Sequence, residues 1–273
     1  MARTLAVANQ KGGVGKTTTA INLAASLALA DQRVLLIDTD PQCNLTSGIG
    51  LKGRSSPAGN IYDALLADHV SDPASFVLAT NVTGLFAIPS DRNLAGAEVE
   101  LVNVDHRETR MRRIVDPLRS AYDFIIIDCP PSLGLLTLNA LVATDAVLIP
   151  LHCEYFALEG LADLVSTLQR VRASLNPDLD IEGVLLTMYD ERTNLGQQVS
   201  SDVREFFKEK VYNTVIPRNV RLGEAPSHGM PVILYDVKSR GAEAYLSLAR
   251  EVIARTVVAR AAQNNTEPTP AAN

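Results

Sequence analysis

The sequence predicts an α/β fold, a doubly wound and mainly parallel β-sheet with helices on both faces. Short apolar runs rich in Val and Ile alternate along the 273 residues with longer amphipathic stretches, and this alternation is typical of repeated βαβ units. The runs are apolar throughout, as strands are when helices cover both faces of their sheet. Right-handed crossovers between parallel strands then place the helices on both sides.

The first half of the chain contains four expected strands. Two of them, RVLLID and FIIID, are apolar runs that each end in an aspartate. A glycine-rich turn follows the first strand and leads into a helix, so the chain opens on a strand–turn–helix unit. The elements expected here are, in order, the strand Thr4–Ala8, the helix Lys16–Ala30, the strands Arg33–Asp38 and Leu85–Pro89, the helix Val99–Leu118 and the strand Phe124–Asp128.

The second half continues the same alternation. Its apolar runs, such as AVLIPL and GVLLTM, are strand-length, and the stretches between them have helical periodicity. The elements expected here are the helix Leu133–Ala143, the strand Ala146–Leu151, the helix Phe156–Ser174, the strand Gly183–Met188, the helix Gln197–Lys210, the strand Val232–Tyr235 and the helix Ala242–Ala262.

A single domain over residues 1–262 is expected, followed by a disordered polar tail over residues 263–273. Lys52–Gly59 is a polar loop containing Gly and Pro, which indicates a surface loop and not a domain linker. The last residues, QNNTEPTPAAN, are polar and contain two prolines, as disordered tails do.

Composition narrows the class of protein. Hydrophobic residues make up 47% and charged residues 21%, which excludes a disordered chain. With 25 Lys and Arg against 31 Asp and Glu, the net charge of −6 argues against a generally basic nucleic-acid coat. The three cysteines lack the spacing of a disulfide framework or a zinc site. Because neither a signal peptide nor a membrane-length apolar run occurs, the cytoplasm is the expected compartment.

A phosphate-binding loop follows the first strand. Residues 10–18 read QKGGVGKTT, and their end fits the pattern G-x-x-x-x-G-K-[ST], although Gln10 stands where the first glycine belongs. Glycines let successive backbone N–H groups point at one anion, and the following helix starts with its positive end at the same place. Lys16 would reach the β- and γ-phosphates of ATP, the Thr17 hydroxyl would bind Mg²⁺, and Thr18 would donate to the α-phosphate.

This segment resembles the deviant Walker A motif of the ParA/MinD group of ATPases, in which a lysine opens the loop. The resemblance implies a P-loop NTPase fold and assigns the position of that lysine to Lys11. In the group this lysine reaches across a dimer interface to the partner's nucleotide, so Lys11 joins Lys16 among the expected catalytic residues. The ATP-binding residues expected in the loop are Lys11, Gly12, Gly13, Val14, Gly15, Lys16, Thr17 and Thr18.

Three aspartates at strand ends complete the expected site. Asp38 and Asp40 follow the second strand two residues apart, so both side chains can face the same way at the edge where parallel sheets bind ligands. The resemblance gives Asp40 the task of positioning the attacking water and places Asp38 near the magnesium. Asp128 ends the FIIID strand as a Walker B aspartate does, close to the Mg²⁺ shell and often through water.

The second half carries strings that closely resemble chromosomal ParA proteins of the Soj type, above all IPRNVRLGEAPSHG. By this resemblance Pro217 and Asn219 border the adenine. Residues 191–260 hold 11 Lys and Arg against 8 Asp and Glu. Basic residues in the motif loops, with no obvious acidic partners, are expected to contact DNA phosphates without reading sequence: Arg192, Arg218, Arg221, Lys238 and Arg240.

The resemblance implies a DNA-partitioning ATPase. ATP with Mg²⁺ would drive dimerisation and binding to nucleoid DNA, and a ParB-type centromere-binding protein would stimulate slow hydrolysis and release. A MinD-like membrane ATPase that places the division site is the alternative, but the polar tail lacks the basic and apolar faces of a membrane-targeting helix. Metal-handling relatives such as the nitrogenase iron protein are less favoured, because Cys43, Cys129 and Cys153 do not match their cysteine positions.

Overall fold

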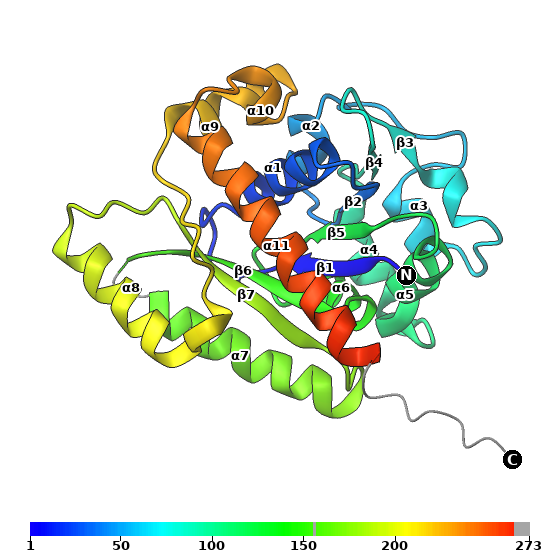
Figure 1. Ribbon diagram of the computed structural model, residues 1–273. Coiled ribbons are helices and arrows are strands. Elements are labelled where there is room, and N and C mark those ends of the chain that lie inside the picture. Colours follow the sequence, from blue (N-terminus) through cyan, green and yellow to red (C-terminus); the bar gives the residue numbers. More distant parts are fainter. Residues whose placement is uncertain (155–156, 265–273) are drawn as a thin grey trace, which may run out of the picture.

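One mostly parallel sheet forms the centre of the molecule (Figure 1). The computed structural model describes residues 1–154 and 157–264, and within them seven strands lie in the order β3-β4-β2-β5-β1-β6-β7. All neighbours pair in parallel except β3, which is antiparallel to β4. The strands are β1 (Arg3–Val7), β2 (Val34–Asp38), β3 (Leu78–Ala79), β4 (Leu85–Ile88), β5 (Phe124–Asp128), β6 (Ala146–His152) and β7 (Asp180–Thr187). The predicted fold class is confirmed.

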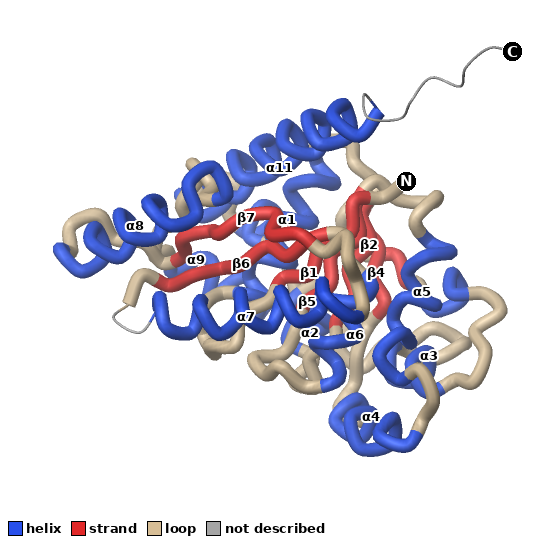
Figure 2. Tube along the Cα trace, turned by 90° about the horizontal axis from the view of Figure 1, so that it is seen from below, coloured by secondary structure: helices blue, strands red, loops and turns tan. Residues whose placement is uncertain are grey.

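Helices cover both faces of this sheet (Figure 2). One face carries α1, α2 and α9 to α11, and the other carries α3 to α8. The helices are α1 (Lys16–Leu29), α2 (Asn44–Gly48), α3 (Ile61–Leu66), α4 (Leu94–Glu100), α5 (Arg110–Leu118), α6 (Leu135–Ala143), α7 (Ala157–Ser174), α8 (Asn194–Phe207), α9 (Val220–Glu224), α10 (Val232–Tyr235) and α11 (Arg240–Asn264).

The strands are apolar throughout because each contributes side chains to both layers. In β5, Ile125 and Ile127 point into the cluster under α3 to α8, whereas Phe124 and Ile126 point into the cluster under α1 and α11. All five residues of β5 and of β2 are buried. Successive side chains of a strand alternate between faces, so a strand covered on both sides leaves no position for a solvated residue.

One expected strand is a helical turn. Val232–Tyr235 forms α10, although its apolar run is strand-like. Pro231 precedes it and Asn22 of α1 accepts the backbone N–H of Val232 at 2.7 Å, so this N–H is not available for a sheet. Val232 and Ile233 are buried against the α1 face, which is why the run is apolar. The prediction of a strand was therefore wrong.

The expected helix over Val99–Leu118 is interrupted. Helix α4 ends at Glu100, two short 3₁₀ turns follow, and α5 begins only at Arg110. His106, between the two 3₁₀ turns, has a φ of +55°, which a continuing α-helix excludes. The side chain of Asn139 in α6 accepts the Met111 N–H at 3.1 Å and so satisfies a donor in the first turn of α5.

The C-terminal helix extends slightly beyond its predicted end. Helix α11 includes Gln263 and Asn264, which had been assigned to the tail, and residues 265–273 lie outside the described residues. Phe156, the predicted first residue of the helix that ends at Ser174, also lies outside them. None of the described helices is both long and apolar enough to cross a membrane.

Candidate functional site

The phosphate loop connects the carboxyl end of β1 to the amino end of α1. Gly13 and Gly15 have φ values of +73° and +87°, a conformation that side chains with a Cβ rarely adopt. Gly15 precedes α1 and offers no side-chain cap, so the first N–H groups of the helix keep their capacity to bind an anion. The Lys16 ammonium turns back over the loop and donates to the carbonyl of Lys11 at 3.0 Å.

Neighbouring strand ends hold this loop in shape. The Asn9 amide donates to the carbonyl of Pro150 on β6 at 2.7 Å, and its oxygen accepts the Lys11 N–H at 3.0 Å. The Thr187 hydroxyl at the end of β7 donates to the carbonyl of Val14 at 2.8 Å. The Thr187 bond engages the Val14 carbonyl of the loop, and the two Asn9 bonds fix the start of the loop against β6.

Asp38 and Asp40 have different surroundings, although both follow β2. Asp38 is fully buried, and one carboxylate oxygen accepts the Thr46 N–H at 2.9 Å and the Thr46 hydroxyl at 2.6 Å. Burial raises the pKa of Asp38 to about 6. Asp40 lines the cavity over the phosphate loop and accepts the Gln42 N–H at 2.9 Å. Asp38 thus anchors α2, and its place near magnesium stays a prediction.

Asp128 is the carboxylate that best fits a metal shell. It is completely buried, and neither of its oxygens has a hydrogen-bond partner among residues 1–154 and 157–264. Burial raises the pKa of Asp128 well above its ordinary value and the Asp38 charge adds to this, while the neighbouring Thr17 hydroxyl opposes both. Unsatisfied buried oxygens next to a threonine suit a hydrated Mg²⁺ that would neutralise them.

A cavity of about 490 Å³ lies over the loop and brings the two halves of the chain together. Pro217 and Asn219 border it together with Asp40, and their place beside an adenine stays a prediction. The Asn219 oxygen also accepts the Arg221 N–H at 2.9 Å and so caps α9. Arg218 lines the same cavity, although the sequence suggested a DNA contact for it. Residues that were not among the expected site residues also line it: Gln42, Asn44, Pro131, Thr187, Met188, Ile216, Leu222, Gly223 and Tyr245.

Lys11 is held by an acidic residue of its own chain. Its ammonium lies 2.5 Å from a carboxylate oxygen of Glu154, just beyond β6, and His152 contacts the other oxygen at 2.6 Å. Lys11 is not among the residues that line the cavity. The Lys11 side chain is thus bound to Glu154 and does not border the cavity, and its reach toward a partner's nucleotide stays a prediction.

Two of the five expected DNA-contacting residues have acidic partners, contrary to expectation. Arg192 binds both carboxylate oxygens of Asp190, at 2.8 and 2.6 Å, because the tight turn after β7 brings the two residues together. Arg221 pairs with Glu224 one helical turn on at 2.8 Å and with Asp236 at 3.2 Å. Among the described residues, Lys238 and Arg240 are exposed and form no ion pair.

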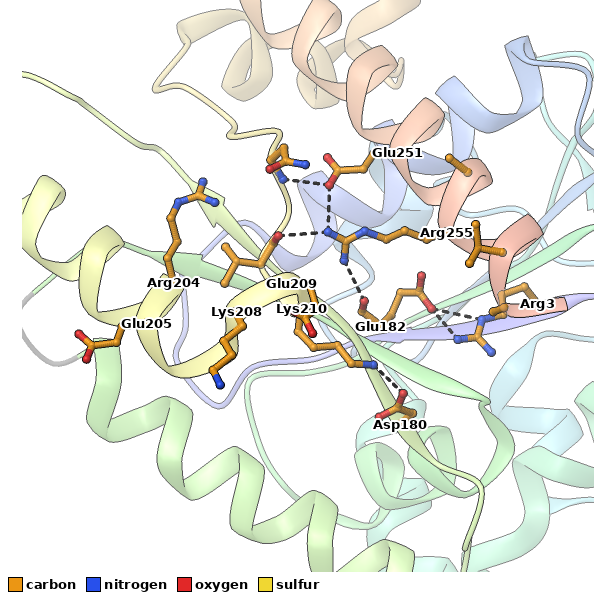
Figure 3. Close-up of a pocket in the computed structure, with 15 residues that line it drawn as sticks. Arg3, Asp180, Glu182, Arg204, Glu205, Lys208, Glu209, Lys210, Glu251 and Arg255 are labelled. Atoms are coloured by element: carbon orange, nitrogen blue, oxygen red, sulfur yellow. Dashed lines mark hydrogen bonds and ion pairs between the residues drawn. The ribbon is translucent and has the colours of Figure 1, made fainter. Parts of the chain in front are cut away.

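A second hollow, of about 970 Å³, lies at the opposite, amino end of β7 (Figure 3). Its charges are largely paired with one another: Arg3 contacts Glu182 at 2.6 Å, and Lys210 contacts Asp180 at 2.6 Å. Ligands of open α/β sheets bind at the carboxyl ends of the strands. The cavity over the phosphate loop is therefore the candidate active site.

The comparisons with known proteins agree with this geometry. The family model described as an AAA domain matches residues 2–181. The chain is 57% identical over 254 residues to the sporulation initiation inhibitor protein Soj of Bacillus subtilis, covering 93% of this chain and 99% of that protein. It is also 57% identical to the chromosome partitioning protein ParA of Myxococcus xanthus, covering 93% and 88%. The chain belongs to the ParA/Soj family of partitioning ATPases.

Solved structures of related proteins share the fold. Cobyrinic acid a,c-diamide synthase from Mycobacterium smegmatis, with bound ADP and magnesium, is 38% identical with a TM-score of 0.79, covering 93% of this chain and 94% of that one. The cell division ATPase MinD of Pyrococcus furiosus is 24% identical with a TM-score of 0.74, covering 92% and 98%, and supports the fold alone. The ParA/Soj relatives and the loop geometry together support nucleotide hydrolysis as the activity of this family member.

Proposed function

We propose that this ParA/Soj family member is a DNA-segregation ATPase that binds ATP and Mg²⁺ in the cavity over the phosphate loop. ATP would join two copies into a dimer that binds DNA without sequence preference, at the nucleoid. A ParB-type partner would stimulate slow hydrolysis and so release the DNA. The observation that carries the proposal is the convergence of the phosphate loop, Asp40 and the Pro217–Asn219 segment on one cavity.

The loop residues have the right chemistry to hold a triphosphate. The N–H groups from Gly12 to Thr18 would donate hydrogen bonds to the phosphate oxygens, and the Lys16 ammonium would move from the Lys11 carbonyl to the β- and γ-phosphates. Mg²⁺ supplies charge neutralisation between these phosphates. Thr17 would bind the ion directly, and Asp128 would accept hydrogen bonds from the water molecules around it. Relatives support this cofactor set, since the Mycobacterium smegmatis structure contains an ATP analogue and magnesium.

Hydrolysis requires a water in line with the γ-phosphate. Asp40 borders the cavity and is held by the Gln42 N–H, so it would orient this water. Catalysis of phosphoryl transfer is mostly positioning and charge neutralisation, so a group with a tuned pKa is not needed. Lys11 would leave Glu154 and stabilise the charge on the partner's nucleotide, which makes hydrolysis depend on the dimer.

The decisive experiment measures binding to an arbitrary DNA duplex with ATP, ADP or no nucleotide, at two salt concentrations. We expect salt-sensitive binding with ATP alone, because only the dimer would combine the phosphate contacts of two copies. Lys16→Ala should lose ATP binding, whereas Asp40→Ala should keep ATP and stay bound to DNA, since the switch back requires hydrolysis. Normal turnover by Asp40→Ala would remove this residue from the reaction.

One result would replace the proposal. If no nucleotide state binds DNA and anionic vesicles are bound instead, the protein acts at a membrane, as the MinD-like alternative requires. Arg218, Lys238 and Arg240 would then have no role toward DNA.

A further inference from the structure

An ion pair between Lys11 and Glu154 lies at the start of the phosphate loop. The Lys11 ammonium is 2.5 Å from Oε2 of Glu154, and neither residue lines the cavity over the loop. Lys11 follows β1, and Glu154 follows the neighbouring parallel strand β6. Within one chain, therefore, the charge of Lys11 is bound by a carboxylate of the same chain and does not border the cavity.

The backbone of Lys11 is fixed without this ion pair. Its N–H donates to Oδ1 of Asn9 at 3.0 Å, and its carbonyl accepts a hydrogen bond from the Lys16 ammonium at 3.0 Å. The Lys11 side chain is 36% exposed, and a lysine stem of four carbons can rotate while its backbone stays in place. The ion pair thus constrains the ammonium group and not the path of the loop.

Glu154 is held from its other side by His152, the last residue of β6. Oε1 of Glu154 lies 2.6 Å from Nδ1 of His152, and the Glu154 N–H donates to the His152 carbonyl at 2.8 Å. Burial lowers the pKa of His152, so at neutral pH this residue contributes a hydrogen bond and not a charge. The hydrogen bond from Lys11 lowers the pKa of Glu154, which therefore stays ionised. The carboxylate is a fixed acceptor whose charge is available to Lys11.

A second cation lies close enough to replace Lys11 beside Glu154. Arg218 lines the cavity and forms no ion pair with any residue of the described ranges. The pKa of Glu154 is lowered first by the Lys11 hydrogen bond and in smaller part by the Arg218 charge, so the two groups interact. Departure of Lys11 would therefore leave the Glu154 carboxylate with a cation nearby.

The ion pair opposes any use of Lys11 outside its own chain. Lys11 must leave Glu154 before it contacts a second copy, and the free energy of the pair is then lost from the free energy of association. The two side chains are 36% and 45% exposed, and a pair this exposed changes an equilibrium constant by about two- to fivefold. Because a dimer breaks two such pairs, its dissociation constant is raised by about four- to twentyfold.

We propose that Glu154 is a positioning residue that holds Lys11 within its own chain and so raises the concentration at which two ATP-bound copies join. The inference rests on the proposed function, in which Lys11 reaches the partner's nucleotide. A triphosphate carries more negative charge than one carboxylate and attracts Lys11 away from Glu154. Without ATP on the second copy no such charge is present, and Lys11 stays on Glu154.

The test compares Glu154→Gln with Glu209→Gln in the full chain. Glu209 is exposed at the hollow beside the amino end of β7 and forms no ion pair with any described residue, so its variant controls for the loss of one negative charge. Sedimentation with a non-hydrolysable ATP analogue measures the dimer dissociation constant. We expect Glu154→Gln to lower this constant about four- to twentyfold and Glu209→Gln to leave it unchanged. The affinity of the single chain for the analogue should not change, because Glu154 does not line the cavity.

A second measurement follows Lys11 itself in the chain without nucleotide. Acetylation of lysines by acetic anhydride, quantified by mass spectrometry, reports how readily each ammonium leaves its partner. Glu154→Gln should raise the acetylation rate of Lys11 by about two- to fivefold. Lys208, which is exposed and forms no ion pair within the described part of the chain, should react at the same rate in both proteins.

The other outcomes overturn this role of Glu154. Equal dimer constants for the wild type and Glu154→Gln, or an unchanged acetylation rate of Lys11, would show that the pair does not restrain Lys11, while the proposed function stands. Weaker association of Glu154→Gln would make Glu154 a contact across the dimer, and an equal gain in Glu209→Gln would assign the effect to net charge. If the wild-type chain does not associate with the ATP analogue, the dimer of the proposed function is wrong as well.

Discussion

Thr187 belongs to none of the sequence motifs, but it contacts the phosphate loop. Its hydroxyl donates to the Val14 carbonyl, and its methyl group would lie 3.8 Å from a Cβ placed at Gly15. The residue is 2% exposed, so no water replaces the bond when the hydroxyl is removed. Thr187 thus ties the end of β7 to the phosphate loop.

We expect Thr187→Val to weaken ATP binding about tenfold, which corresponds to roughly 1.4 kcal/mol. Valine keeps the shape but leaves the buried Val14 carbonyl without a donor, and an orphaned buried acceptor costs about 1 to 3 kcal/mol. Thr187→Ser retains the hydroxyl and should bind ATP nearly as the wild type does. Calorimetric titration with an ATP analogue measures both. Equal affinities for the valine and serine variants would contradict the role of the hydrogen bond.

The parts of the site that sequence could predict are those whose residues are contiguous. The loop from Lys11 to Thr18 could be recognised because its phosphate-binding residues are consecutive within one strand–turn–helix unit. Thr187 and Glu154 were missed because their partners, Val14 and Lys11, are 173 and 143 residues away in the chain. Their residue types are ordinary, and only the sheet order, with β6 and β7 beyond β1, brings them to the loop.

At the level of elements, the edge strand β7 depends on a glycine. Gly183 lies next to a register shift between β6 and β7. A Cβ at this position would lie 2.6 Å from the Tyr212 ring and 2.8 Å from the Lys210 carbonyl. Both neighbours belong to the segment that returns from α8 toward the active site, so the close approach positions that segment.

Gly183→Ala should therefore lower the free energy of unfolding by about 1 to 3 kcal/mol, the usual cost of overpacking a buried site. Gly160 in α7 is the matched control, because a Cβ there meets nothing within 4 Å. Gly160→Ala should be neutral or stabilising by up to about 1 kcal/mol, since alanine favours helix. Urea denaturation measures both variants. A loss of stability in both would mean that the Tyr212 contact is not the cause.

Besides the buried apolar side chains of α11, one arginine connects this helix to the edge of the sheet (Figure 3). The Arg255 guanidinium donates to the carbonyls of Glu182 at 3.3 Å and Val211 at 3.1 Å, and lies 4.2 Å from the centre of the Tyr212 ring. Glu251, one turn earlier on α11, accepts a further bond at 2.9 Å. Arg255 thus connects α11, β7 and the segment after α8.

We expect Arg255→Ala to cost about 2 to 3 kcal/mol of unfolding free energy, because it removes a cation–π contact and leaves two carbonyls without their donor. Arg250 lies on the same helix and is exposed, so Arg250→Ala should change stability by less than about 0.5 kcal/mol. Chemical denaturation with hydrogen exchange of α11 would test this. Unchanged protection of α11 in Arg255→Ala would contradict the anchoring role.

Sequence patterns predicted helices and strands well where periodicity and burial agree. They failed where local contacts determine the type of an element or the point at which it ends. The parallel strands of the sheet were predicted because burial on both faces leaves only apolar residues, whereas the two-residue antiparallel edge strand β3 was not predicted. Val232–Tyr235 was misassigned because burial against α1 produces the same apolar run as a buried strand. The break between α4 and α5 depends on His106 at positive φ and on Asn139 of α6, and neither signal can be read from periodicity.

At the scale of the whole molecule, the sheet order explains why one site needs residues from both halves. The phosphate loop follows β1 in the middle of the sheet, Asp40 follows β2 two strands away, and Thr187 ends β7 at the edge. Pro217 and Asn219 complete the cavity from beyond β7. Because β1, β2 and β7 run parallel, their carboxyl ends all lie on the same side of the sheet.

The charge distribution predicts which basic residues would contact DNA in the proposed function. The chain is acidic overall, with a net charge of −6, so binding would rely on a few local cations. Arg192 already neutralises Asp190 and Arg221 already faces Glu224 and Asp236. A phosphate would have to compete with these carboxylates. Lys238 and Arg240 have no such partner among the described residues and can neutralise a phosphate fully.

Arg240→Ala should therefore weaken ATP-dependent DNA binding more than Arg192→Ala does. A full phosphate contact changes the slope of log affinity against log salt by roughly 0.9 for each cation that is neutralised. In a dimer the change would occur twice, so Arg240→Ala should reduce the slope by close to 2, and Arg192→Ala by clearly less. Fluorescence anisotropy on a short duplex measures both slopes between about 50 and 200 mM salt. Over this range the affinity of a protein with many phosphate contacts falls by about 10³-fold or more. Equal slopes for the two variants would mean that Asp190 releases Arg192 when DNA binds, and the pairing seen here would then be a feature of the unbound state that the DNA phosphates replace.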